Sequence, residues 1–244
     1  MAELPTASQF IDRLAALRSP EELKKYERFF PLAQRGEDVF IGVRMGEVFA
    51  LAKEFVAMPL KEIENLLESP THEARVGAVS VMDFQARDKK TTPERRRDLF
   101  ELYMRRHDRI DTWDLVDRSA LHVVGRYLID KPRDILYTLA RSESMAERRT
   151  AIVSTIYFAG RGDVGDTFRI AEILLNDQED LIHKATGWAL RVAGGKELLD
   201  FLDSHAVAMP RTMLRYAVEK LDKDQRDHYM ALKKQAKAFG GHPI

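Results

Sequence analysis

The sequence predicts an all-α protein built as a solenoid of helical repeats. Apolar residues recur at spacings of three and four along most of its periodic segments, which is the period of an amphipathic helix. Alternating strand patterns bounded by turn residues are nearly absent. A weak internal repeat of small and aliphatic residues is the third observation, and it indicates that each helix packs between neighbours.

Six segments have the clearest helical spacing. They are residues 10–17, 48–56, 60–67, 97–104, 168–175 and 212–221. Serine or threonine precedes several of the predicted helices, and proline follows some of these residues. Both features favour the start of a helix. These predicted caps are Ser19, Ser69, Thr92 and Ser142.

The internal repeat comprises five segments with a basic residue near the start, followed by small and aliphatic residues at helical spacing. They are residues 73–82, 117–125, 147–156, 182–191 and 209–218. Their separation of about 30 to 45 residues is typical of HEAT-like or armadillo-like helical hairpins. The alternative is that any all-α core yields alanine-rich helices that begin with arginine. Five aligned examples favour the solenoid, so we expect one repeat domain over residues 1–244, with a basic C-terminal segment from about residue 225.

The composition excludes several classes of protein. The 244 residues are 45% apolar, enough for a large core, and contain 39 basic and 39 acidic residues. The chain has no cysteine, so disulfides, thiolate nucleophiles and cysteine-based zinc sites are excluded. No signal-peptide pattern and no apolar stretch of membrane-spanning length occur, so we expect a cytoplasmic protein that does not enter a membrane.

Basic residues recur at the starts of the five repeat segments. They are Arg75, Arg118, Arg149, Lys184 and Arg211. In a solenoid, such positions come together along one concave groove, so this row is a candidate phosphate-binding track. The basic clusters at residues 95–97 and 105–106 and the pair Arg148-Arg149 add to it, and residues 233–237 form a basic tail. For any single position, the alternative is a solvated helix face with ion pairs one turn apart.

Several catalytic schemes have no support in the sequence. No glycine-rich phosphate-binding motif and no G-x-S-x-G nucleophile motif occur. The seven histidines are scattered without metal-ligand spacing, so we expect neither a metal site nor a cofactor.

The segment TWDLVD (residues 112–117) has the strongest chemical pattern. On a helix, Trp113 shares a face with Asp117, while Asp114 turns partly aside. A carboxylate beside an aromatic wall can stabilise a developing positive charge. The alternative is a core tryptophan with Asp117 paired to Arg118 or another arginine. Trp188, with Arg191 one turn beyond it, places the second tryptophan beside charges on another predicted groove helix.

Four segments resemble, in order and spacing, the AlkD-like DNA alkylation repair family, DNA glycosylases built of HEAT-like repeats. They are FIGVR (residues 40–44), TWDLVD (112–117), ERRTAI (147–152) and HKATGWALR (183–191), and the resemblance runs from about residue 20 to about residue 225. The chain departs from the family at Met45-Gly46, where proline is common after FIGVR.

The resemblance implies roles for particular residues. Asp117 resembles the catalytic carboxylate, Trp113 and Trp188 resemble the pair that embraces the deoxyribose of the lesion, and Arg149 resembles a phosphate-holding arginine. Arg191 is expected to be an additional backbone contact, and Tyr26 resembles a third family aromatic near the N-terminus.

The expected function is therefore excision of cationic N3- or N7-alkylated purines from duplex DNA. The resemblance implies that the groove grips the lesion strand and leaves the base outside a tight pocket. The alternative is a non-catalytic scaffold for DNA or protein, and a third possibility is a scaffold whose tryptophans are core residues. A monomer is expected, because groove binding by a solenoid needs no partner chain.

Overall fold

The computed structural model describes residues 4–26, 28–31 and 37–239, with side chains described as far as Leu232. Within these ranges the backbone is helical and holds no β-strand beyond an isolated bridge between Val39 and Thr71. The prediction of an all-α fold arranged as a helical-repeat solenoid is confirmed for this part of the chain. No helix among the described residues is long and apolar enough to span a membrane.

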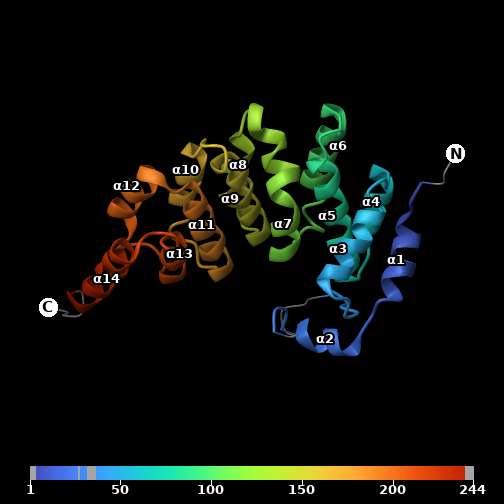
Figure 1. Ribbon diagram of the computed structural model, residues 1–244, viewed down its shortest axis with the longest axis horizontal. Helices are drawn as coiled ribbons and strands as arrows, with labels where there is room; N and C mark the ends of the chain where they lie inside the picture. Colours follow the sequence, from blue (N-terminus) through green and yellow to red (C-terminus); the bar gives the residue numbers. More distant parts are fainter. Residues whose placement is uncertain (1–3, 27, 32–36, 240–244) are drawn as a thin grey trace. The chain divides into compact units, whose positions relative to one another are not determined.

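The chain divides into two compact units, Met1–Tyr127 and Leu128–Ile244, which are described separately. The first unit holds α1 (Ala7–Ala15), α2 (Pro20–Tyr26), α3 (Met45–Glu54), α4 (Leu60–Leu67), α5 (His72–Arg87), α6 (Pro93–Arg105), α7 (Trp113–Ala120) and the π-helical turn η2 (Leu121–Gly125). Helix α5 is its centre, because α3, α4, α6 and α7 all pack against it (Figure 1). Helix α1 covers α3 and α4 at the N-terminal end.

The second unit is built around a row of three neighbouring helices. It holds α8 (Asp134–Leu139), α9 (Met145–Ala159), α10 (Gly165–Ile173), α11 (Asp180–Ala193), α12 (Gly195–His205), α13 (Arg211–Ala217) and α14 (Lys223–Phe239), and the short 3₁₀ turn η3 (Tyr127–Asp130) leads into it. Helices α9, α11 and α13 pack side by side in sequence order (Figure 1). Helices α8 and α10 pack against α9, and α10 and α12 pack against α11, so α9 and α11 have partners in a second layer.

The five repeat segments fall on α5, α7 with η2, α9, α11 and α13, so all of them are helical as predicted. Two of the predicted caps act as expected: Thr92 accepts a hydrogen bond from the backbone N–H of Arg95 at 3.2 Å, and Ser19 accepts one from the backbone N–H of Glu22 in α2 at 3.4 Å. The prediction for Ser142 was wrong, because Ser142 lies two residues before the cap of α9. That cap is Ser144, which accepts from the N–H of Glu147 at 3.4 Å. The prediction for Ser69 was wrong, because α5 begins after Thr71 and the Ser69 hydroxyl accepts from the Thr71 N–H instead.

Small residues allow the repeat helices to approach closely. A Cβ atom at Gly187 in α11 would lie 2.5 Å from the carbonyl oxygen of Met213 and 2.5 Å from the Cβ of Tyr216, both in α13. Real Cβ atoms do not come this close to backbone atoms, so only glycine permits this crossing of α11 and α13.

Replacement of Gly187 by alanine is expected to destabilise the protein by about 1 to 3 kcal/mol, because the added methyl group forces α11 and α13 apart. Urea unfolding followed by circular dichroism measures the change. The matched control is Gly46→Ala in α3, where an added Cβ meets nothing within 4 Å and alanine has the better helix propensity. Equal unfolding midpoints for the two variants would contradict the packing argument.

Candidate active site

The short helix α7 carries the residues that the sequence predicts to be catalytic. It begins directly after Thr112, whose backbone is extended and whose hydroxyl donates to Asp114 Oδ1 at 2.7 Å. Trp113 and Asp117 lie one turn apart, and both are partly buried. The helix continues into the π-helical turn η2 (Leu121–Gly125), a rare geometry that occurs frequently at functional sites.

Trp113 and Asp117 line one cavity of about 420 Å³ in the first unit. Its other lining residues are mostly aromatic or apolar: Tyr26, Phe29, Phe30, Met45, Phe49, Val76, Asp114 and Arg118. Three residues that the sequence singles out, Trp113, Asp117 and Tyr26, are therefore brought together by α2 and α7. A carboxylate in an apolar, aromatic-walled cavity acts on a neighbouring cation more strongly than it would in water.

Aromatic packing fixes the orientation of Trp113. Its indole stacks on Phe30, with ring centroids 5.7 Å apart and an interplanar angle of 13°. Phe30 packs in turn against Tyr26 and Phe40. The Tyr26 hydroxyl donates to the carbonyl oxygen of Val43 at 2.5 Å, and burial raises the pKa of this phenol. Tyr26 therefore offers the cavity its ring, while its predicted contact with DNA stays a prediction.

The FIGVR segment is held by one buried carboxylate. Glu73 accepts hydrogen bonds from three successive backbone N–H groups, those of Ile41 at 3.1 Å, Gly42 at 2.8 Å and Val43 at 3.3 Å. Gly42 has φ of +79°, and a Cβ atom there would lie 2.3 Å from the carbonyl oxygen of Ser19. Helix α3 begins at Met45 without the proline that is common in the family, and Met45 lines the cavity.

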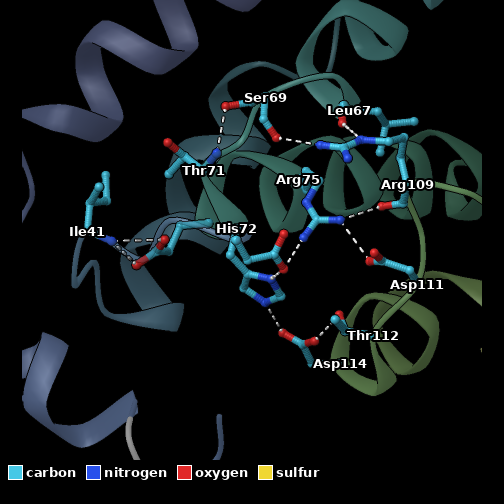
Figure 2. Close-up of polar contacts among 12 residues, drawn as sticks. Ile41, Leu67, Ser69, Thr71, His72, Arg75, Arg109, Asp111, Thr112 and Asp114 are labelled. Carbon is cyan, nitrogen blue, oxygen red and sulfur yellow. Dashed lines mark hydrogen bonds and ion pairs between the residues drawn. The ribbon is translucent and has the colours of Figure 1, made fainter. Parts of the chain in front are cut away.

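A buried cluster of charges connects α5 to the first turn of α7 (Figure 2). His72 is fully buried, and its Nε2 donates to Asp114 Oδ2 at 2.8 Å. Its Nδ1 lies 3.4 Å from Asp38 Oδ2. Burial opposes protonation, but the hydrogen bond with Asp114 and the nearby carboxylate of Asp38 prevail and raise the pKa of His72 to about 9. The same contacts with His72 overcome burial and lower the pKa of both Asp114 and Asp38.

Arg75 belongs to this cluster and does not line a groove. Its guanidinium is fully buried; it donates to Asp111 at 2.7 Å, to the carbonyl oxygen of Arg109 at 3.1 Å and to Asp38 (Figure 2). The inclusion of Arg75 in the predicted phosphate-binding row was therefore wrong. Like the other members of the row, Arg75 lies near the start of its helix. Helix α5, however, is covered by neighbouring helices, so the side chain of Arg75 is buried.

Arg118 stands beside Asp117 in the cavity wall. Its guanidinium donates to Asp83 Oδ2 at 2.8 Å and to the Ser80 hydroxyl at 2.9 Å. It lies between the rings of Phe49 and Phe84, 4.7 Å and 4.8 Å from their centroids. Two cation–π contacts and a buried carboxylate hold this cation in place, so it is a fixed part of the wall.

In the second unit, the predicted DNA-binding residues lie on α9 and α11. Lys184, Trp188 and Arg191 share one face of α11, at spacings of four and three, and all three are partly buried. Lys184 pairs with Asp180 at 2.8 Å, and Arg191 pairs with Glu219.

On α9, Arg148 is held by Asp177 at 2.6 Å. Arg149 is only 4% exposed and donates to the carbonyl oxygen of Leu181 in α11. Arg211, the last member of the predicted row, is exposed and donates to the carbonyl oxygen of Met230 at 2.9 Å. The side chains of the basic segment 233–237 lie outside the described residues.

Trp113 and Asp117 belong to the first unit, and Arg149 and Trp188 to the second. The convergence of these four residues on one spot therefore stays a prediction. No group of histidine, aspartate and glutamate side chains in the described ranges has an arrangement suited to a metal ion.

Sequence reasoning missed His72, Phe30 and Phe49. Phe30 and Phe49 lie outside the recognised motifs, and no local pattern marks them as cavity residues. His72 precedes the glutamate that holds FIGVR, but its partner Asp114 is 42 residues further along the chain. Only the packing of α5 on α7 reveals that contact.

Asp83→Asn is expected to destabilise the protein by about 3 to 5 kcal/mol, because the carboxylate is 1% exposed and compensates the largely buried Arg118. Urea unfolding measures the loss. The matched control is Asp130→Asn, which removes an exposed carboxylate paired to Lys131 and should leave the midpoint almost unchanged. A small effect for Asp83→Asn would show that Arg118 needs no buried partner.

Comparison with known proteins assigns the chain to a family. No curated protein matches it in sequence. Residues 10–221 match the family described as DNA alkylation repair enzyme. The match spans most of both units and includes all four segments on which the resemblance was based. The chain therefore belongs to the DNA alkylation repair enzyme family, and its role lies in the repair of alkylated DNA.

Proposed function

We propose that the protein is a DNA glycosylase that removes cationic N3- or N7-alkylated purines from duplex DNA. The observation that carries the proposal is the cavity in which Asp117 and Trp113 stand side by side among aromatic rings. A scaffold that only binds DNA has no use for a carboxylate in such a place. Membership of a family of alkylation repair enzymes supports the same choice.

The proposed reaction is hydrolysis of the N-glycosidic bond. The bond between C1′ and the purine nitrogen breaks, and its electron pair leaves with the base, which becomes neutral. The sugar passes through an oxocarbenium-like state, which the Asp117 carboxylate stabilises electrostatically. Water then forms the new bond to C1′ and gives up a proton, and we propose that Asp117 orients this water and accepts the proton.

Aromatic rings add to the stabilisation of the cationic sugar. The face of an indole carries a negative quadrupole, and a cation over it gains about 0.5 to 2 kcal/mol. Trp113 is held for this role by its stacking on Phe30. We propose that Trp188, on α11, contributes a second indole to this stabilisation. A cavity of about 420 Å³ lies within the usual size range of small-molecule sites and is large enough for a sugar.

The DNA backbone is proposed to contact the cations of the second unit. Lys184 and Arg191 have partly exposed partners, Asp180 and Glu219, and exposed ion pairs contribute little to stability. Both side chains can therefore exchange a carboxylate for a phosphate at small cost. Arg149 and Arg148 are proposed as further backbone contacts near the N-terminus of α9.

The Asp117→Asn variant is expected to release base at least about 10²-fold more slowly than wild type, since it loses a preorganised charge. The assay is release of N7-methylguanine from duplex DNA under single-turnover conditions. Asp12→Asn, at an exposed position of α1, is the matched control and should react at the wild-type rate. Equal rates for wild type and Asp117→Asn would refute the role of Asp117. Tight DNA binding without any base release by wild type would instead support a non-catalytic scaffold.

Trp188→Ala is expected to slow base release by about 2- to 30-fold, the loss of one cation–π contact. Its melting temperature should stay close to that of wild type, because Trp188 is partly exposed on α11. Calorimetry and the base-release assay together separate the two effects. A large drop in melting temperature with an unchanged rate would show that Trp188 serves packing alone.

A further inference from the structure

We infer that His72 is a positioning residue for this site: set between Asp114 and Asp38, it fixes the first turn of α7 and with it Trp113 and Asp117. His72 touches neither the proposed substrate nor the reacting atoms. Its expected effect on the rate rests on the proposed function, whereas its effect on the conformation of α7 does not.

Two separate contacts link the imidazole to the site. One is polar: Nε2 donates to Asp114 at 2.8 Å, and Asp114 is the neighbour of Trp113 in the first turn of α7. The other is aromatic: the His72 ring lies 4.9 Å from the ring of Phe30, on which Trp113 stacks. The imidazole also stacks on Phe40 at 4.6 Å, and Phe40 in turn packs against Phe30. Movement of His72 therefore reaches Trp113 by both routes.

The protonation state of His72 determines the net charge of the buried cluster. Asp114 faces it from α7, Asp38 faces it from the segment before FIGVR, and Arg75 lies one turn further along α5 (Figure 2). Asp111 completes the cluster through Arg75, so three carboxylates meet two cations. Glu73, the remaining acid of this turn, is satisfied by backbone N–H groups. Loss of the His72 proton leaves three carboxylates and one cation, Arg75, in this cluster, and Asp114 then has no charged partner in it.

The direction of the pH effect follows from the raised pKa. The imidazolium stabilises the folded cluster fully below the ordinary histidine pKa, near 6.5, and this contribution disappears as the pH rises through about 9. Asp114 and Asp38 have lowered pKa values and stay ionised throughout that range. Burial raises the pKa of nearby Tyr26, so its phenol keeps its proton. In this cluster, His72 is the group that changes charge at mildly alkaline pH.

The first test compares the pH dependence of single-turnover base release by wild type and His72→Gln, with non-enzymatic release subtracted. Glutamine can donate to Asp114 but cannot titrate. The wild-type rate should fall above about pH 9, whereas the variant should lack this alkaline limb and be about 10- to 100-fold slower at pH 7.5. Affinity for duplex DNA should change less than about 3-fold.

His107→Gln is the matched control, since His107 is another buried histidine of the first unit, and its ring packs edge-on against Tyr103. If the role of His72 is purely structural, His72→Gln and His107→Gln should lose similar stability. Both variants should then also keep the fall in rate above about pH 9 that wild type shows. That result, or equal rates for wild type and His72→Gln, would overturn the inference.

The second test needs no catalytic activity. The chain has two tryptophans, so Trp188→Phe leaves Trp113 as the only indole, and its emission is followed from pH 6 to 10.5. A transition near pH 9 is expected, and it should vanish when His72→Gln is added but persist when His107→Gln is added. Absence of the transition would overturn the inference even in an active enzyme. An inactive protein that shows it would overturn the proposed function alone.

If Trp188→Phe disturbs folding, nuclear magnetic resonance of the ¹⁵N-labelled imidazole in the wild-type protein reads the same titration. A His72 resonance that titrates near its ordinary pKa, with no coupled shift in the Trp113 indole signal, contradicts the inference.

Discussion

The candidate site depends on the buried cluster of charges at the start of α5. His72, Glu73 and Arg75 bring three ionisable side chains into one turn of a helix that is covered on all sides. Each of these buried charges has a partner: Asp114 pairs with His72, backbone N–H groups bond to Glu73, and two aspartates pair with Arg75. Removing one partner of such a buried pair is far more costly than removing a surface pair, since the remaining charge stays desolvated. These contacts tie FIGVR, α5 and α7 together and so determine the shape of the cavity.

The helical framework could largely be predicted from the sequence, because amphipathic spacing reports directly on burial. The prediction for residues 60–67 coincides with α4, and all five repeat segments are helical. The small residues of those segments were read correctly as a sign of close packing, as Gly187 shows. Helix starts were less predictable. Ser69 and Thr71 have similar capping chemistry, and only the path of the chain into α5 decides between them.

The candidate site was predictable where its residues lie close together in sequence and obscure where they do not. Trp113 and Asp117 are one turn apart, so their shared face could be deduced from helical geometry. The cavity also needs Phe30 and Phe49, which come from distant segments without a motif. The inclusion of Arg75 in the row of cations was wrong for a related reason. A position on one helix does not tell which acids the neighbouring segments present, and Arg75 meets two of them, Asp38 and Asp111, which lie outside the helices.

The π-helical turn that follows α7 has a consequence for how relatives of this chain are compared. An α-helix advances by about 100° per residue, so the wider turn at Leu121–Gly125 changes the angular phase of everything after it. Arg118 before the turn and His122 within it both reach the carboxylate of Asp83. A homologue with one residue fewer here would present a different face beyond the turn. Alignments that pass through this segment without a gap can therefore match residues that point in different directions.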